Sequence, residues 1–358
     1  MLEPLCQKVW EGRRITPAEA CCLFALPLED LGALANRRRE LAKAADFGGR
    51  GNEIVTYIVD RNINYTNVCN VYCKFCAFYR VEKDPDAYVL TFDELDQKVE
   101  ETLAQGGTQI LLQGGHHPKL SLQWYLDLLA HLKSNYPRLN VHGFSPSEFV
   151  HFQKVFDLPL REILSRFREA GLGSIPGGGG EILVDRVRQR ISPLKAMSGE
   201  WLDVMDCAHR LGMKTTATMM FGHVETIADR VEHLARVRDQ QDRTGGFTAF
   251  IGWTFQSENT RLKAPTAGAH DYLKTQAVSR IYLDNFRNVQ SSWVTQGPGI
   301  GQIALKYGAN DLGSTMIEEN VVSKAGASFR MEVEDMRRLI SDLGYEPRQR
   351  DNEYNLVS

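Results

Sequence analysis

The sequence lacks the features that mark membrane or nucleic-acid-binding proteins. No apolar run approaches the roughly 18 residues that span a bilayer, and the amino terminus, with Glu3 and Pro4, has no basic start before an apolar block. Its 42 basic and 45 acidic residues are interspersed over 358 residues, so the formal net charge is only −3. This balance gives no electrostatic footprint for nucleic acid or anionic membrane. We therefore expect a cytoplasmic protein that acts on a small molecule, without nucleic acid or membrane as a partner.

The sequence also lacks the regular cysteine pattern of a disulfide framework. Its seven cysteines are an odd and unevenly spaced set in a long chain, which favours reduced thiols. Four of them have no partner at the spacing of metal ligands, and we expect these to be small apolar residues on helices: Cys6, Cys21, Cys22 and Cys207.

The other three cysteines form a Cys-x3-Cys-x2-Cys triplet of Cys69, Cys73 and Cys76, with no fourth cysteine or fitting histidine nearby. Three thiolates can hold three irons of a 4Fe-4S cube and leave the fourth iron free for a ligand that is not protein. A zinc knuckle or a closed electron-transfer cluster would need a fourth protein ligand. An iron–sulfur or zinc binding module without enzymatic activity is the non-enzyme alternative.

The pattern of apolar residues changes once along the chain. Apolar positions recur at helical spacing through the first 46 residues, with a helix start signal at Thr16-Pro17-Ala18-Glu19, so we expect residues 1–50 to form an N-terminal helical extension. From residue 51, short β-rich runs alternate with amphipathic ones, which is typical of βα units and a parallel sheet. The predicted strands are 54–59, 109–112, 140–144, 173–175, 215–221, 248–254, 289–294 and 311–314. The predicted helices between them are 92–105, 122–133, 160–170, 199–211, 228–242 and 271–286.

Eight such units predict an α/β fold, a (β/α)8 TIM-type barrel over residues 51–330. A C-terminal helix and polar tail follow over residues 331–358, and we expect residues 348–358 to be loose. The active site of such a barrel lies at the carboxyl ends of the strands, in the βα loops. Polar or glycine-rich segments follow the predicted strands in order: the cysteine loop, 113–118, 145–148, 176–181, 222–225, 256–259, 296–299, and the region of Asp311 and Ser314.

Several motifs resemble a known family. Residues 63–80, with Ala77-Phe78-Tyr79-Arg80 after the cysteines, resemble the cluster loop of radical S-adenosylmethionine (SAM) enzymes. Four further blocks resemble the futalosine and deazaflavin-cofactor branch of that superfamily, and within it the dehypoxanthine futalosine cyclases of menaquinone biosynthesis: 173–183, 215–226, 247–251 and 308–316. The resemblance covers most of residues 50–330. The sequence departs from the family pattern at Gly252 and Ser257, where proline is usual, which concerns the loop after the sixth strand and not the reaction class.

The resemblance implies a barrel of the radical SAM superfamily that holds a 4Fe-4S cluster and SAM. The three cysteines would bind the cluster, and SAM would chelate its open iron. Phe75 would lie near the adenine, and Gly114 and Gly115 would contact the methionyl amino group. Glu181 and Arg190 would bind the ribose and carboxylate of SAM. Ordinary structural roles compete with each: loop packing for Phe75, a tight turn for the glycines, a helix N-terminal charge for Glu181 and a surface ion pair for Arg190.

The resemblance also implies an oxidoreductase reaction. A 5′-deoxyadenosyl radical would take the ribose C4′ hydrogen of dehypoxanthine futalosine, and the carbon radical would cyclise onto the benzoate ring with loss of an electron and a proton. An external one-electron reductant such as flavodoxin or ferredoxin would reduce the cluster. The proton requires a base within hydrogen-bond distance, and the candidates at the predicted rim are Glu148, Asp311, Glu225, His116 and His117. Ser145 and Asp311 are the predicted substrate contacts, because both follow strands at the functional face.

Two alternatives within the same class stay open. Aminofutalosine synthase would share the fold and the cluster but add the adenosyl radical to an enol ether, so the adenosyl group would end in the product. A deazaflavin-cofactor synthase-type enzyme is the other. Release of 5′-deoxyadenosine would favour the cyclase over aminofutalosine synthase.

Overall fold

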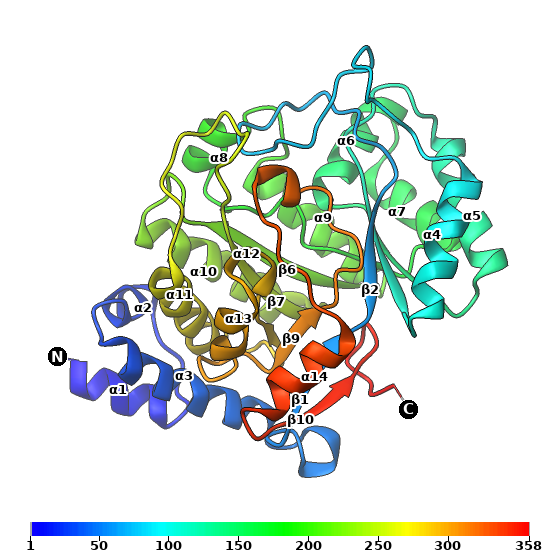
Figure 1. The fold of residues 1–358 in the computed structure, drawn as a ribbon. Helices are drawn as coiled ribbons and strands as arrows, with labels where there is room; N and C mark the ends of the chain where they lie inside the picture. The colour runs from blue at the N-terminus through cyan, green and yellow to red at the C-terminus, as the bar shows by residue number, and fades with distance from the viewer. Residues whose placement is uncertain (1, 358) are drawn as a thin grey trace.

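Ten parallel strands form a single sheet within residues 2–357, the part of the chain that the computed structural model describes (Figure 1). Met1 and Ser358, the outer ends of the predicted terminal segments, lie outside the described residues. The strands are β1 (Ile54–Ile58), β2 (Asp60–Asn64), β3 (Gln109–Gln113), β4 (Asn140–Gly143), β5 (Ser174–Ile175), β6 (Lys214–Phe221), β7 (Phe247–Thr254), β8 (Val289–Gln290), β9 (Asp311–Ser314) and β10 (Glu346–Gln349).

The sheet closes into a barrel because β1 and β2 are two halves of one strand that changes neighbours at Val59. β1 pairs with β9 on one side and β10 on the other, whereas β2 pairs with β3. Beyond β9, the Thr315 N–H donates to the Ile58 carbonyl at 3.0 Å and the Ile317 N–H to the Asp60 carbonyl at 3.2 Å. The upper half of this strand therefore has β3 on one side and the end of β9 on the other. The predicted (β/α)8 barrel is confirmed.

Helices cover the outside of the barrel, and several begin where a side chain caps the first turn. Thr91 with Glu94, Ser145 with Glu148, and Thr226 with Asp229 form capping boxes that satisfy free N–H groups. The helices of the barrel are α4 (Phe92–Ala104), α5 (Leu122–Asn135), α6 (Pro146–Phe156), α7 (Leu160–Ala170), α8 (Asp185–Ile191), α9 (Ser198–Arg210), α10 (Ile227–Thr244), α11 (Ala269–Tyr282), α12 (Trp293–Gln296) and α13 (Pro298–Ala304). Among the helices described for residues 2–357, none combines the length and apolarity that a membrane crossing requires.

The predicted helical extension consists of α1 (Leu2–Trp10), α2 (Pro17–Leu23) and α3 (Leu28–Lys43). The helix start predicted at Thr16 is confirmed, since Thr16 and Glu19 form a capping box with Pro17 in the first turn. α3 packs against α11 and α2 against α10, at the end of the molecule where both termini lie in Figure 1. The extension thus covers the barrel far from the cysteine loop.

Two local predictions differ from the structure. The strand predicted at 289–294 ends at Gln290, because the Ser292 N–H leaves the sheet and donates to the Tyr272 hydroxyl at 2.7 Å before α12 begins. Residues 145–148, predicted as a rim loop, start helix α6. The Ser-Pro-x-Glu sequence there is itself a helix start signal.

The expectation of a loose polar tail after residue 348 is wrong. α14 (Val333–Ser341) is followed by β10, which pairs in parallel with β1. Arg350 is only 5% exposed, and its guanidinium donates to Asp311 at 2.5 and 3.1 Å while stacking on the Tyr354 ring. Asp311 has no exposed surface, so its ion pair with Arg350 is buried. Through this pair the tail closes the lower end of the barrel.

Replacing Arg350 by alanine should destabilise the fold by about 3–5 kcal/mol, because Asp311 would keep a buried charge without its partner. The matched control is Arg348→Ala, which removes a half-exposed pair with Glu346 and should cost about 0–1 kcal/mol. Denaturant unfolding of the two variants measures the difference. Equal stabilities would contradict a structural role for the tail.

Candidate active site

The three cysteines lie on the loop that joins β2 to α4, at the upper end of the barrel in Figure 1. Backbone hydrogen bonds fix this loop: the Cys69 N–H donates to the Arg80 carbonyl at 2.9 Å and the Lys74 N–H to the Ile191 carbonyl at 2.8 Å. Burial raises the pKa of Cys73 to about 12 and also raises the pKa of Cys69, and charge at Cys76 raises both further. The three free thiols thus lie on one loop that backbone hydrogen bonds hold in place.

The arrangement of these thiols suits a cluster better than a single ion. No three His, Cys, Asp or Glu side chains within residues 2–357 converge on one metal position. Structural zinc requires such convergence, because all its ligands bind one ion. A 4Fe-4S cube does not, because each thiolate binds a different iron. The donor set therefore fits a cube with one iron left open.

Gly114 and Gly115 support the cysteine loop from below. A Cβ on Gly115 would overlap the Val68 carbonyl oxygen and lie 2.9 Å from the Cβ of Cys69, and a Cβ on Gly114 would overlap the Tyr65 ring. The Gly115 N–H donates to the Thr66 carbonyl at 3.0 Å. Within the described residues, the backbone of this glycine pair therefore packs tightly against the start of the cysteine loop.

Glu148 joins the loops that follow three consecutive strands. Its buried carboxylate accepts hydrogen bonds from the Tyr65 hydroxyl at 2.8 Å, the Gly114 N–H at 3.2 Å, and the N–H and hydroxyl of Ser145 at 2.7 and 2.8 Å. Burial raises the pKa of Glu148, and these hydrogen bonds act in the opposite direction. Glu148 and Ser145 are therefore both engaged in holding the rim.

Glu181 lies at the end of the glycine-rich segment 177–180, beside the cysteine loop. It is 4% exposed with a φ of 31°, a conformation that non-glycine residues adopt rarely and mostly at functional sites. Its Oε1 accepts from Lys195 Nζ at 2.8 Å, and its Oε2 has no hydrogen-bond partner within residues 2–357. Burial opposes the charge on Lys195, but Glu181 and Cys73 outweigh it and raise the pKa of Lys195. Lys195 Nζ also lies 5.4 Å from the centre of the Phe75 ring.

Arg188, and not Arg190, holds the glycine-rich segment. Arg188 is fully buried and donates to the carbonyls of Gly180 at 2.8 Å, Gly179 at 2.9 Å and Ala196 at 2.8 Å. Arg190 is exposed on the same helix, α8. Two residues along a helix point to nearly opposite faces, so the structure brings Arg188 to Glu181 and does not bring Arg190.

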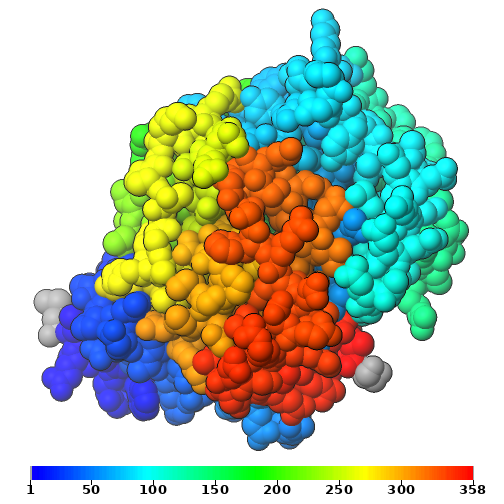
Figure 2. Space-filling model, in the orientation of Figure 1, coloured from blue at the N-terminus to red at the C-terminus, as the bar shows by residue number. Residues whose placement is uncertain are grey.

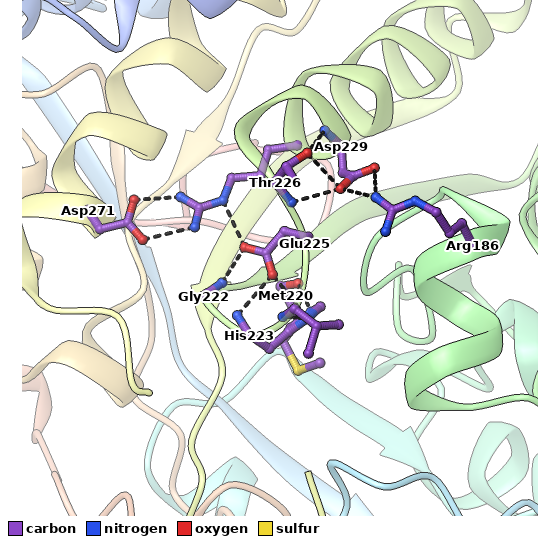
Figure 3. A network of polar contacts seen from close by, with 10 residues as sticks. Arg186, Met220, Gly222, His223, Glu225, Thr226, Asp229 and Asp271 are labelled. Carbon is purple, nitrogen blue, oxygen red and sulfur yellow. Dashed lines mark hydrogen bonds and ion pairs between the residues drawn. The ribbon is translucent and has the colours of Figure 1, made fainter. Parts of the chain in front are cut away.

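Glu225 lies at the centre of the polar network in Figure 3. Its carboxylate accepts the Gly222 and His223 N–H groups at 2.6 and 2.9 Å and pairs with Arg230 at 2.9 Å, and Arg230 also pairs with Asp271 at 2.6 Å. Although burial acts in the opposite direction, His223 and Arg230 hold the pKa of Glu225 well below its ordinary value. This network ties the loop after β6 to α10 and α11.

The other predicted base candidates lie in the protein interior. Burial lowers the pKa of His116 well below its ordinary value, and its ring lies 5.0 Å from that of His151. His117 Nδ1 accepts the N–H groups of Lys119 and Leu120 at 3.1 and 3.2 Å. Asp311 forms the ion pair with Arg350 described above.

A cavity of about 290 Å³ occupies the barrel interior below the cysteine loop. Its wall formed by β2, β3, β4 and β6 is mostly polar, with Asp60, Asn62, Gln109, Gln113, His142, Thr216 and Thr218. Its wall formed by β7 and the segments after β8 and β9 is more apolar, with Ala249, Ile251, Trp253, Val294, Met316, Val321 and Val322, although Thr248, Ser291, Ser292, Thr295 and Glu319 also line it. Glu181 belongs to its upper wall, and Arg350 and Tyr354 to its floor. Burial lowers the pKa of His142 to about 3, so this histidine is neutral.

Two segments meet over the cavity mouth. Asn259 Nδ2 donates to the Lys324 carbonyl at 3.0 Å, and Asn320 Nδ2 to Asn64 Oδ1 at 3.3 Å. Figure 2 shows the yellow segment after β7 beside the orange segment after β9 on this face. These contacts tie the segment after β9 to the segment after β7 and to the end of β2.

Sequence reasoning missed most of the cavity wall. A strand with one polar face has a polar side chain at every second residue. The sequence shows this spacing at Asp60, Asn62 and Asn64, and again at Gln109 and Gln113. The first set was overlooked because we predicted that the first strand ends at residue 59. No sequence pattern marks Lys195 as a site residue, because only the fold brings Glu181, Phe75 and Cys73 near it.

Comparison with known proteins agrees with this geometry. Residues 63–237 match the model of the radical SAM superfamily, and residues 244–358 match the CofH/MqnC C-terminal region. The chain is 42% identical to cyclic dehypoxanthine futalosine synthase of Halalkalibacterium halodurans over 358 residues, covering 99% of this chain and 95% of that protein. This chain belongs to the radical SAM superfamily.

Further relatives lie in the same branch of the radical SAM superfamily. The chain is 45% identical to cyclic dehypoxanthine futalosine synthase of Streptomyces coelicolor, over 99% of this chain and 88% of that protein, and 38% identical to aminodeoxyfutalosine synthase of Thermus thermophilus, over 99% and 96%. The crystal structure of methylornithine synthase shares the fold, with a TM-score of 0.73 at 18% identity over 96% of this chain and 97% of that one. The family implies a 4Fe-4S cluster and SAM.

Gly115→Ala should prevent stable cluster assembly, because the added Cβ must push Val68 and Cys69 outward. We expect a severalfold drop in iron bound per chain after anaerobic reconstitution. The control is Gly199→Ala, where a Cβ meets nothing within 4 Å and alanine favours the helix. Wild-type iron content in Gly115→Ala would contradict this role for the glycine pair.

Proposed function

We propose that Cys69, Cys73 and Cys76 hold a 4Fe-4S cluster whose open iron binds SAM. The donor set fits, since the loop after β2 carries these three free thiols and the sequence offers no fourth cysteine near them. When bound, the two groups supply a 5′-deoxyadenosyl radical by reductive cleavage of the sulfonium. Glu181 Oε2, which has no hydrogen bond within residues 2–357 and lies 3.7 Å from Arg188 Nη1, offers an acceptor for the ribose hydroxyls of SAM, and Phe75 offers an apolar face near its partner Lys195.

We propose that the substrate is dehypoxanthine futalosine and the product its cyclic form. The observation that carries this proposal is the near full-length identity of 42–45% to relatives named for that product. The cavity supports it: a polar wall suits a sugar and the opposite apolar wall suits an aryl ring. The hydrogen-bonded segments around Asn259 and Asn320 lie on this face, where they would limit the access of water to a reactive carbon radical.

We assign positioning roles to the predicted base candidates that are fully paired in the structure. Glu148 holds the ends of three strands, Glu225 holds the loop after β6, and Asp311 neutralises Arg350 at the floor. His116 is not among the described residues that line the cavity. A one-electron reductant such as flavodoxin or ferredoxin would act at the cluster, and seven free cysteines are compatible with the reducing cytoplasm where such reductants occur.

The product distinguishes this proposal from aminodeoxyfutalosine synthesis, the reaction named for the Thermus thermophilus relative. Reconstituted, reduced enzyme incubated anaerobically with SAM and dehypoxanthine futalosine should release 5′-deoxyadenosine and a product that has lost one hydrogen atom, one proton and one electron. Cys73→Ala, which removes a cluster ligand, should yield neither compound by mass spectrometry. Unchanged substrate together with consumption of aminofutalosine precursors would contradict the proposal.

Glu181→Gln should weaken SAM binding about tenfold, or about 1.4 kcal/mol, because the amide removes the negative charge at the acceptor oxygen. Cluster content should stay at the wild-type level, since Glu181 is not a thiol ligand. Equilibrium binding of SAM, with iron content and thermal unfolding measured in parallel, tests this. Glu162→Gln on α7, a partly exposed residue paired with Arg166, is the control, and equal SAM affinity in both variants would refute the assignment.

A further inference from the structure

The polar groups of the cavity wall mostly satisfy one another. Gln109 donates to Asp60 Oδ2 at 2.8 Å and accepts from Asn140 Nδ2 at 2.9 Å. His142 contacts the Ser174 hydroxyl at 2.7 Å and lies 3.5 Å from the Thr216 hydroxyl. These side chains therefore shape the wall and are already engaged with the protein.

Asn62 is different. It is 4% exposed and lines the cavity, and its Oδ1 has no hydrogen-bond partner anywhere in residues 2–357. Its neighbour in register on β3 is Leu111, which has no polar side-chain atom. A buried acceptor without a donor is unfavourable, so this oxygen is suited to a donor that enters the cavity.

The orientation of the Asn62 amide follows from Asn64. Asn64 Nδ2 donates to the Gln113 carbonyl at 3.3 Å, which turns Asn64 Oδ1 toward Asn62. Asn62 Nδ2 faces that oxygen at 3.5 Å. The Asn62 carbonyl oxygen is consequently the atom that is left free.

Two other buried atoms of the cavity lining make no hydrogen bond in the described chain: Glu181 Oε2 beside the cysteine loop, which has Arg188 Nη1 at 3.7 Å, and the Tyr354 hydroxyl at the floor. Asn62 lies between them in height, because β2 runs from Asp60 near the floor toward the cysteine loop after Asn64. A ligand held at Asn62 would therefore lie below a cofactor bound at Glu181.

We propose that Asn62 accepts a hydrogen bond from a sugar hydroxyl of the substrate and so fixes the sugar against β2, with the aryl ring on the opposite wall of Ile251, Trp253 and Met316. This inference rests on the proposed function. The chemistry of that substrate favours it: its carboxylate and ketone oxygens only accept hydrogen bonds, whereas its sugar hydroxyls donate. The sugar hydroxyls are thus the hydrogen-bond donors of the substrate, and Asn62 Oδ1 is the acceptor without a donor in the cavity wall.

The test is a thermodynamic cycle that combines replacement of the Asn62 side chain with removal of each sugar hydroxyl from the substrate. Calorimetry on cluster-loaded enzyme measures the dissociation constants of dehypoxanthine futalosine and of three analogues that each lack the C1′, C2′ or C3′ hydroxyl. Wild-type enzyme should bind one analogue about tenfold to a hundredfold more weakly than the substrate. Asn62→Leu should bind the substrate as weakly as wild type binds that analogue, and should no longer distinguish the two.

The control variant is Thr248→Val, because the Thr248 hydroxyl already donates to the Thr215 carbonyl at 3.2 Å; it should keep the discrimination of wild type. If Asn62→Leu does not fold, the smaller Asn62→Ala must show the same loss. Wild-type discrimination in a folded Asn62 variant would overturn the inference. Failure of wild-type enzyme to bind or convert dehypoxanthine futalosine would instead overturn the proposed function.

Discussion

The buried carboxylate of Glu148 is the interaction on which the upper end of the barrel depends. It binds Tyr65 after β2, Gly114 after β3 and Ser145 after β4, so three strand ends share one hydrogen-bonding centre. Gly114 and Gly115 have no room for a side chain because Tyr65 and Val68 are packed against them. The cysteine loop is thereby fixed to the rim of the sheet, and thiols held this rigidly are preorganised for a cluster.

From this rim the site extends downward as a cavity with two unlike walls. The amide and hydroxyl side chains of β2, β3, β4 and β6 face the apolar side chains of β7 and of the segments after β8 and β9. The C-terminal tail closes the floor through the Arg350 pair with Asp311. The apolar wall and the floor both fall within the matched CofH/MqnC region, residues 244–358, so that region completes the substrate chamber of the radical SAM barrel.

Much of this architecture could be predicted from the sequence, because strand alternation, helix periodicity and the cysteine spacing are local signals. The roles of single polar residues could not. Glu148 was predicted as a base, but its partner Tyr65 lies 83 residues away, and only the fold reveals that the carboxylate is engaged. The arginine beside Glu181 was predicted at 190, whereas the register of α8 turns Arg188 inward. The tail was expected to be loose because polar composition alone does not show that Arg350 has a buried partner.

The central claim is that the three thiols of the cysteine loop leave one iron open for SAM. Electron paramagnetic resonance of the reduced, reconstituted enzyme tests it most directly, because a ligand that binds the cluster changes the electronic environment of its irons. The account predicts a 4Fe-4S signal that shifts when SAM is added and is lost in Cys73→Ala. A cluster signal that SAM leaves unchanged, or that persists without Cys73, would contradict it.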